Sequence, residues 1–164
     1  MSKSLGLLEK IELLVPGFRG YKQKELIRED DALIRRKIAS LLDESRQSLE
    51  QFLIYVKRKD IDLALRLDDL RLELMKVSQM IRHAPYGYAS LYNRVRIKEE
   101  ELQQILEHDY RLITLANEIL NATNSLYGLQ NTGEILNKAN EIWGKLMILE
   151  REIRFRNNMF KIER

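Results

Sequence analysis

The stretch 60–83 reads DIDLALRLDDLRLELMKVSQMIRH, and its pattern decides the fold class. Its apolar positions recur at intervals of three and four residues, at Leu63, Leu67, Leu70, Leu74, Val77 and Ile81. Side chains at this spacing share one face of an α-helix, whereas a strand would alternate apolar and polar residues. The stretch contains neither Pro nor Gly. We therefore predict a helix with one buried face.

The same pattern continues on both sides of this stretch, and both prolines and most glycines fall in the breaks between the periodic segments. The segments predict an all-α fold, an antiparallel bundle of about four long helices plus a short N-terminal helix. The predicted helices cover about 3–14, 21–57, 60–83, 90–124, and a final stretch that is capped by Asn131 and frays beyond Phe155.

The boundary at Lys57-Arg58-Lys59-Asp60 has no Pro or Gly and must be argued from register. Extending the apolar row from Val56 by heptad spacing would require an apolar residue at position 66, but the apolar residue is Leu67. Four consecutive charged residues ending in an Asp also suit a turn followed by an N-cap. We predict a turn here. The alternative is one helix of more than 60 residues, which would need a partner chain in a coiled coil.

Length and composition indicate one domain over 1–164, with a short helix and turn at 1–20 and a basic, fraying tail at 156–164. The 164 residues include no Cys, which excludes disulfides, thiolate metal sites and a Cys nucleophile. No apolar run approaches the roughly 18 residues of a membrane span. Charged residues also interrupt the apolar N-terminal stretch, unlike a signal peptide, so we expect a cytoplasmic protein.

The spacings that mark catalysis or metal binding are missing from the sequence. The two histidines, His83 and His108, lack the Glu-x-x-His and His-Glu-x-x-His patterns of di-iron and zinc sites. There is no glycine-rich phosphate loop. Asp109 falls within an apolar row, where we expect it to be buried and paired with an Arg or a Tyr. We therefore predict no catalytic, metal or cofactor-binding residue and no enzymatic activity.

The segment PGFRGYKQKE, residues 16–25, resembles the opening of a group of uncharacterised prokaryotic helical proteins that begin with a Pro-Gly turn and a Gly-Tyr-Lys helix start. The resemblance covers about a tenth of the chain. It implies a prokaryotic source and a helical fold, and it transfers no site.

The leading functional hypothesis is a non-enzymatic interaction or scaffold protein that acts through helix-helix pairing with another copy, as a homo-oligomer, or with another helical protein. Its basis is that the apolar faces are wider than a narrow seam. Additional apolar residues flank the main rows, at Leu65, Leu72, Leu136, Trp143 and Met147.

The alternative hypothesis is binding to nucleic acid or an anionic surface. The net charge of +3 resides entirely in residues 151–164, and the rest of the chain is neutral. If helices alternate in direction, the turn at 15–20 and the loop at 84–89 lie at the same end as this tail, and basic and aromatic residues gather there. The candidate contacts are Arg19, Lys22, Lys24, Arg154, Arg156, Phe160 and Lys161.

Overall fold

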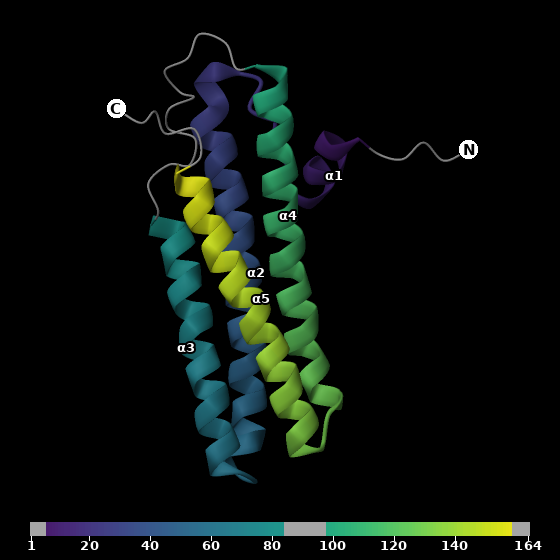
Figure 1. Cartoon of the computed structure of the whole chain (residues 1–164), viewed down its shortest axis with the longest axis vertical. Coiled ribbons are helices and arrows are strands. Elements are labelled where there is room, and N and C mark those ends of the chain that lie inside the picture. The colour runs from purple at the N-terminus through teal and green to yellow at the C-terminus, as the bar shows by residue number, and fades with distance from the viewer. Residues whose placement is uncertain (1–5, 84–97, 159–164) are drawn as a thin grey trace, which may run out of the picture.

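The computed structural model describes residues 6–83 and 98–158, and within these ranges the chain is helical with no strand. The short helix α1 spans Leu7–Leu14, and four long helices follow: α2 (Ile27–Lys57), α3 (Ile61–His83), α4 (Glu99–Asn124) and α5 (Thr132–Asn158). Two single-turn 3₁₀ segments adjoin the long helices in sequence: η1 (Lys24–Leu26) directly precedes α2, and η3 (Ser125–Gly128) directly follows α4. The all-α bundle of four long helices plus a short N-terminal helix is confirmed (Figure 1).

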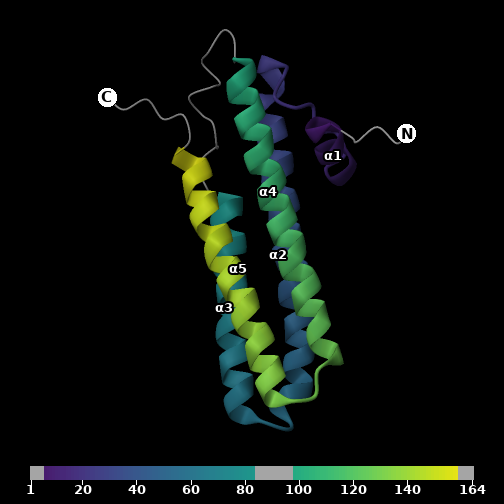
Figure 2. The same cartoon turned by 45° about the vertical axis from the view of Figure 1, so that its right-hand side comes forward.

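Successive long helices run in opposite directions (Figures 1 and 2). However, the order of the helices around the bundle differs from their order in the sequence. Helix α2 packs on α3 and α4, and α5 packs on the same two helices. The neighbours α2 and α4 therefore run parallel, as do α3 and α5. The described contacts agree with this arrangement, since Ser48 of α2 meets Asn124 of α4 and Lys76 of α3 meets Glu150 of α5.

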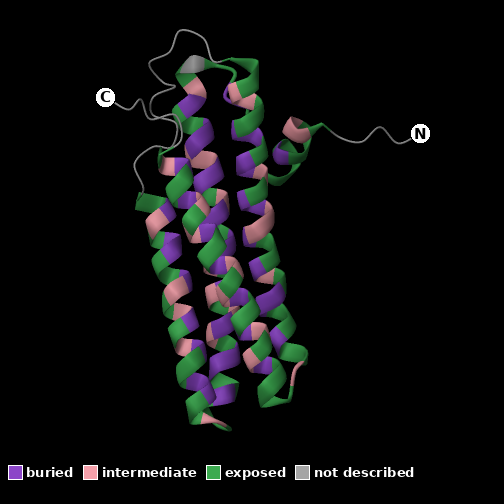
Figure 3. Cartoon of the chain, in the orientation of Figure 1, coloured by how far each residue is buried: buried purple, intermediate pink, exposed green. Residues whose placement is uncertain are grey.

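The core lies between the four long helices, and each contributes one buried face (Figure 3). All six apolar positions that define the predicted helix over 60–83 are buried, at 4% exposure or less. The apolar row of α5 is also buried, at 9% exposure or less, and comprises Ile135, Ala139, Ile142, Leu146, Leu149 and Ile153. Ser45 interrupts the row of α2 without leaving an unsatisfied hydroxyl, because its Oγ donates to the carbonyl oxygen of Leu41 at 2.9 Å.

The turn predicted at 57–60 is confirmed, so α2 and α3 form a hairpin and not one long helix. The backbone N–H groups of Lys59 and Asp60 both donate to the Val56 carbonyl and close the end of α2. Asp60 Oδ1 then accepts from the Leu63 backbone N–H at 3.1 Å, which is the N-cap interaction expected of this residue. At the other hairpin, Asn131 Oδ1 caps α5 by accepting from Gly133 and Glu134.

Helix α2 begins later than predicted, at Ile27 and not at position 21. The reason is the Asp30 side chain, which accepts hydrogen bonds from the backbone N–H groups of Arg19 and Tyr21 and holds the preceding segment in a turn. Gly20 and Tyr21 both have positive φ, at 75° and 61°. A Cβ on Gly20 would lie 2.8 Å from Leu8 Cδ1, so this glycine lets α1 pack closely on the turn.

The structure tests the remaining predicted ends only in part. The predicted starts at 3 and 90 lie outside the described residues, as does the loop at 84–89. Helix α5 continues to Asn158, three residues beyond the point where fraying was expected.

Candidate functional site

Among the residues that the structure describes, the predicted contacts for anions do not form one accessible basic surface. Arg19 pairs with Glu29 at 3.6 Å, and Arg154 pairs with Glu150 at 2.8 Å. Lys22 is exposed and lines a groove of about 510 Å³ between α1 and α4. Lys24 belongs to the turn η1, and Phe160 and Lys161 lie outside the described residues.

The structure corrects the placement of Arg156, which was expected in the accessible basic tail. Its residue is 0% exposed. Because α5 continues through this position, Arg156 lies three residues after Ile153 on the buried face of the helix. A count of charges along the chain could not reveal this burial, since the acidic partners belong to two other helices.

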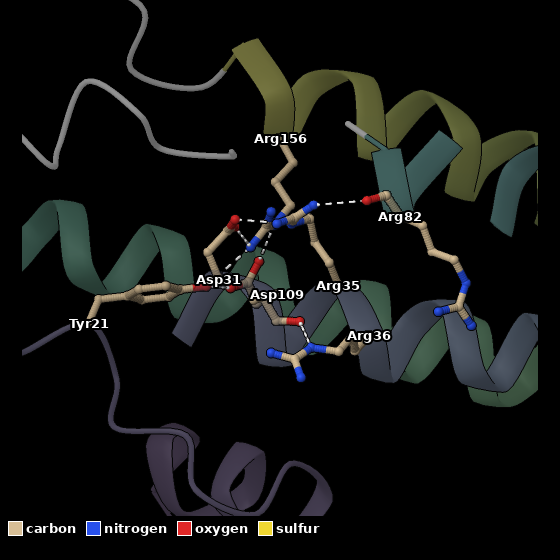
Figure 4. Close-up of polar contacts among 8 residues, drawn as sticks. Tyr21, Asp31, Arg35, Arg36, Arg82, Asp109 and Arg156 are labelled. Atoms are coloured by element: carbon tan, nitrogen blue, oxygen red, sulfur yellow. Dashed lines mark hydrogen bonds and ion pairs between the residues drawn. The ribbon is translucent and has the colours of Figure 1, made fainter. Parts of the chain in front are cut away.

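Arg156 is the centre of a buried ionic cluster with Tyr21, Asp31, Arg35 and Asp109, here called the Arg156 cluster (Figure 4). Arg156 Nη2 lies 2.5 Å from Asp31 Oδ1, and Arg156 Nε donates to Asp109 Oδ1 at 2.9 Å. The Tyr21 hydroxyl donates to Asp109 Oδ2 and accepts from Arg156 Nη2 at 3.2 Å. Arg35 Nε donates to the second Asp31 oxygen at 3.0 Å.

The Arg156 cluster joins residues of three long helices and of the turn after α1. Asp31 belongs to α2, Asp109 to α4 and Arg156 to α5, while Tyr21 belongs to the turn after α1. Arg35 Nη1 also donates to the Arg82 carbonyl at 3.3 Å, at the end of α3. The predicted pairing of Asp109 is confirmed, because it bonds both an Arg and a Tyr. The turn at 15–20 also lies at the same end of the bundle as the last turns of α5, as predicted.

Burial and charge pairing act in opposite directions on the acids of this cluster. Loss of hydration raises the pKa of Asp31, and the neighbouring Arg156 and Arg35 guanidinium groups partly offset that rise. Arg156, Asp31 and Asp109 are each 0% exposed, so solvent does not reach their charged groups. This arrangement suits a structural clamp better than a ligand-binding site.

His108 is a second buried polar group, one residue before Asp109 on α4. It is 2% exposed, its Nε2 lies 2.9 Å from Glu152 Oε2 on α5, and its ring packs edge-on against Phe155. Burial lowers the pKa of His108, and the Glu152 contact only partly opposes that shift. The hydrogen-bond partner of His108 is therefore an acid of another helix, not one of its sequence neighbours Glu107 and Asp109.

The outer face of α3 carries a stripe of exposed apolar side chains. It comprises four exposed side chains, here called the α3 outer stripe: Ile61 (68% exposed), Leu65 (63%), Leu72 (42%) and Met75 (40%). Their spacing places them on one face of the helix, opposite the buried row that begins at Leu63. Asp68 interrupts the stripe and is bound to Arg71 Nε at 2.8 Å.

A shallow groove adjoins one end of the stripe, beside the α2–α3 turn. It has a volume of about 410 Å³ and is lined by Lys57, Ile61, Ala64, Leu65 and Asp68. Ile54, which precedes Lys57 by one turn of α2, is also 59% exposed.

Sequence reasoning identified only part of this surface. It singled out Leu65 and Leu72 as additional apolar residues but not Ile61 or Met75, although all four share the same heptad spacing. Of the flanking residues on α5, Met147 is 60% exposed, whereas Leu136 and Trp143 are partly buried against the core. Leu136 and Trp143 of α5 are therefore used inside the bundle, whereas Leu65 and Leu72 of α3 are not, although α5 also exposes Ile148 and Phe155.

Comparisons with protein-family models, with curated proteins and with solved structures found no match to this chain. Within the described ranges, no three His, Asp or Glu side chains are placed to hold a metal ion. None of the helices formed by these residues combines the length and the apolar character needed to cross a membrane. The geometry itself must therefore carry any functional proposal.

Proposed function

We propose that this protein is a non-enzymatic interaction or scaffold protein that pairs the α3 outer stripe with a helix of another protein molecule. The single observation that carries the proposal is the stripe itself: four large apolar side chains at coiled-coil spacing, all pointing away from a core that is complete without them.

The energetic reason is the transfer of apolar surface from water. Burying a large aliphatic side chain contributes about 1.5–3 kcal/mol relative to leaving it exposed. Single exposed apolar residues are ordinary on protein surfaces, but a row along one helix face forms a continuous patch. A partner helix at the same spacing could cover all four residues at once.

The distribution of charge favours this proposal over binding to nucleic acid or an anionic surface. Among the predicted anion contacts, Arg156 is buried between carboxylates, and Arg19 and Arg154 each have a carboxylate within 4 Å. Pairing with carboxylates reduces the positive potential that phosphate groups would meet.

Site-specific photo-crosslinking in the native cells tests the proposal. A benzophenone side chain is placed at Leu65, or at Leu13 of α1 as a control, because Leu13 is also apolar and 71% exposed but lies off the stripe. We expect protein adducts from position 65 and few from position 13, with the adducts at 65 suppressed by Leu72→Glu. Equal labelling at both positions, or none at 65, would contradict the proposal.

A further inference from the structure

We infer that the partner of the α3 outer stripe is a second copy of this chain, and that the two α3 helices pair antiparallel about a two-fold axis near Asp68. This inference rests on the proposed function and adds the identity and orientation of the partner.

The stripe is symmetric about Asp68. Ile61 and Met75 lie seven residues on either side of Asp68, and Leu65 and Leu72 lie three and four residues from it. When two copies of α3 run in opposite directions about this position, Ile61 meets the other copy's Met75 and Leu65 meets its Leu72. Every apolar residue of the stripe is then covered by another, as an isologous interface requires.

The surface at the end of the stripe is hollowed. The wall of the groove at Ile61 includes Ala64, whose side chain is small. Antiparallel pairing brings Met75 of the second copy to this groove. A methionine side chain is flexible and suits an irregular apolar hollow.

Charges along one flank of the stripe favour the antiparallel orientation. Asp62, Asp69 and Lys76 follow one another at heptad spacing on the flank from which Lys76 reaches Glu150 of α5. In an antiparallel pair, residues of this flank face the same flank of the other copy, so each Asp62 lies opposite a Lys76, giving two attractive contacts, while the two Asp69 carboxylates meet near the axis and give one repulsive contact. A parallel pair would instead bring Arg71 near Lys76 of the other copy, which is repulsive.

The polar residue at the centre fits the same orientation. Asp68 is not an isolated charge, since Arg71 binds it within the same helix. The two-fold axis brings the Asp68–Arg71 ion pairs of the two copies together. Their carboxylate and guanidinium groups can then alternate around the axis. A polar pair at one position of an apolar seam is a known means of fixing register and orientation.

Disulfide trapping tests the inference with few complications, because the chain contains no natural cysteine. The full-length variants Ile61→Cys and Met75→Cys are prepared separately, mixed in equal amounts and oxidised with diamide. We expect a cross-linked species containing one copy of each variant, and little cross-linking when either variant is oxidised alone. Adding Leu65→Glu to both chains should abolish the cross-link, while Leu13→Glu should leave it unchanged.

The outcomes separate this inference from the proposed function. Strong cross-linking of Ile61→Cys alone would show a parallel pair and overturn the orientation. No cross-linked species in any mixture, with photo-adducts at Leu65 to a different protein, would overturn self-pairing but leave the proposed function standing. Absence of both cross-links and photo-adducts would overturn both. Circular dichroism of each variant checks that the fold is retained.

Discussion

At the scale of single residues, Arg156 shows how a buried charge can decide how helices are joined. Its guanidinium contacts carboxylates from α2 and α4, and the Tyr21 hydroxyl completes the arrangement. The burial of Asp109 could be predicted because it interrupts an apolar row. The burial of Arg156 could not, because it follows Phe155 in a segment rich in basic residues and its partners are far away in sequence.

Replacing Arg156 with Met should destabilise the protein by about 3–5 kcal/mol, because two buried carboxylates lose their main counter-charge. The matched control is Arg154→Met, two residues earlier, where the side chain is 67% exposed and its ion pair is with Glu150. We expect the control to change the free energy of unfolding by less than about 1 kcal/mol. Urea denaturation of both variants measures the difference, and equal effects would contradict the clamp.

His108 should make stability depend on pH on the acidic side of neutrality. Burial lowers its folded-state pKa below the ordinary histidine value of 6.5, so the unfolded chain binds more protons between these two pKa values. The stabilisation that neutral His108 contributes is fully present above the pKa of this residue in the unfolded chain. It is lost as the pH falls toward its pKa in the folded protein. His108→Gln should flatten the pH profile of the unfolding free energy over that window. An unchanged slope would show that His108 does not carry the dependence.

The buried aspartates should act in the opposite direction. The pKa values of Asp30 and Asp31 are raised chiefly by burial, so the folded state binds more protons than the unfolded state just above pH 3.8. The contribution of these two aspartates to the unfolding free energy therefore falls as the pH rises from 3.8 through their raised folded-state pKa values. We expect Asp31→Asn to weaken this component in acid urea titrations, even though the variant also loses an ion pair. If the unfolding free energy of Asp31→Asn fell more steeply with rising pH than that of the wild type, Asp31 would not be the source of this pH dependence.

At the scale of helices, periodicity predicted the apolar faces better than the ends. The row from Leu63 to Ile81 lies in the core, and the register slip before Leu67 marks a real turn. The start of α2 was predicted six residues too early, because Asp30 holds the preceding backbone through side-chain hydrogen bonds. Apolar spacing does not report such a contact.

The cap of α3 provides a test at this scale. Asp60→Ala should cost about 1 kcal/mol of stability, because the Leu63 backbone N–H loses its acceptor. Asp60→Asn keeps an acceptor oxygen at the same position and should recover most of the loss. Thermal and urea unfolding measure both variants, and an equal loss for Asn and Ala would show that charge, not capping, dominates at this position.

At the scale of the whole molecule, the inward-facing rows of the described helices form the core, and an apolar row on α3 lies outside it. The sequence predicted wide apolar faces but could not assign each extra residue to the interior or the surface. That assignment depends on the diagonal placement of α3 and α4, which leaves the face of α3 opposite the core uncovered by any described helix. The candidate interaction surface is therefore a property of the packing and not of one helix alone.

The two-fold axis brings Asp69 of the two copies close together, so Asp69→Asn should strengthen dimerisation. Removing one exposed like-charge contact should lower the dissociation constant roughly two- to fivefold. In a parallel pair the heptad neighbour of Asp69 is Ala64 of the other copy, and the substitution should have little effect. Sedimentation equilibrium of the two proteins measures the change, and a weaker dimer would contradict the antiparallel arrangement.

The claim that two copies pair through α3 is tested most directly by sedimentation equilibrium of the wild-type chain beside Leu65→Glu. We predict that the wild type forms a dimer whose population rises with concentration, and that Leu65→Glu is monomeric at the same concentrations. At dilutions where both proteins are monomeric, their melting temperatures should agree, since this side chain is 63% exposed. Leu13→Glu should dimerise like the wild type. A wild-type chain that remains monomeric up to its solubility limit, or a Leu65→Glu variant that dimerises equally well, would contradict the claim.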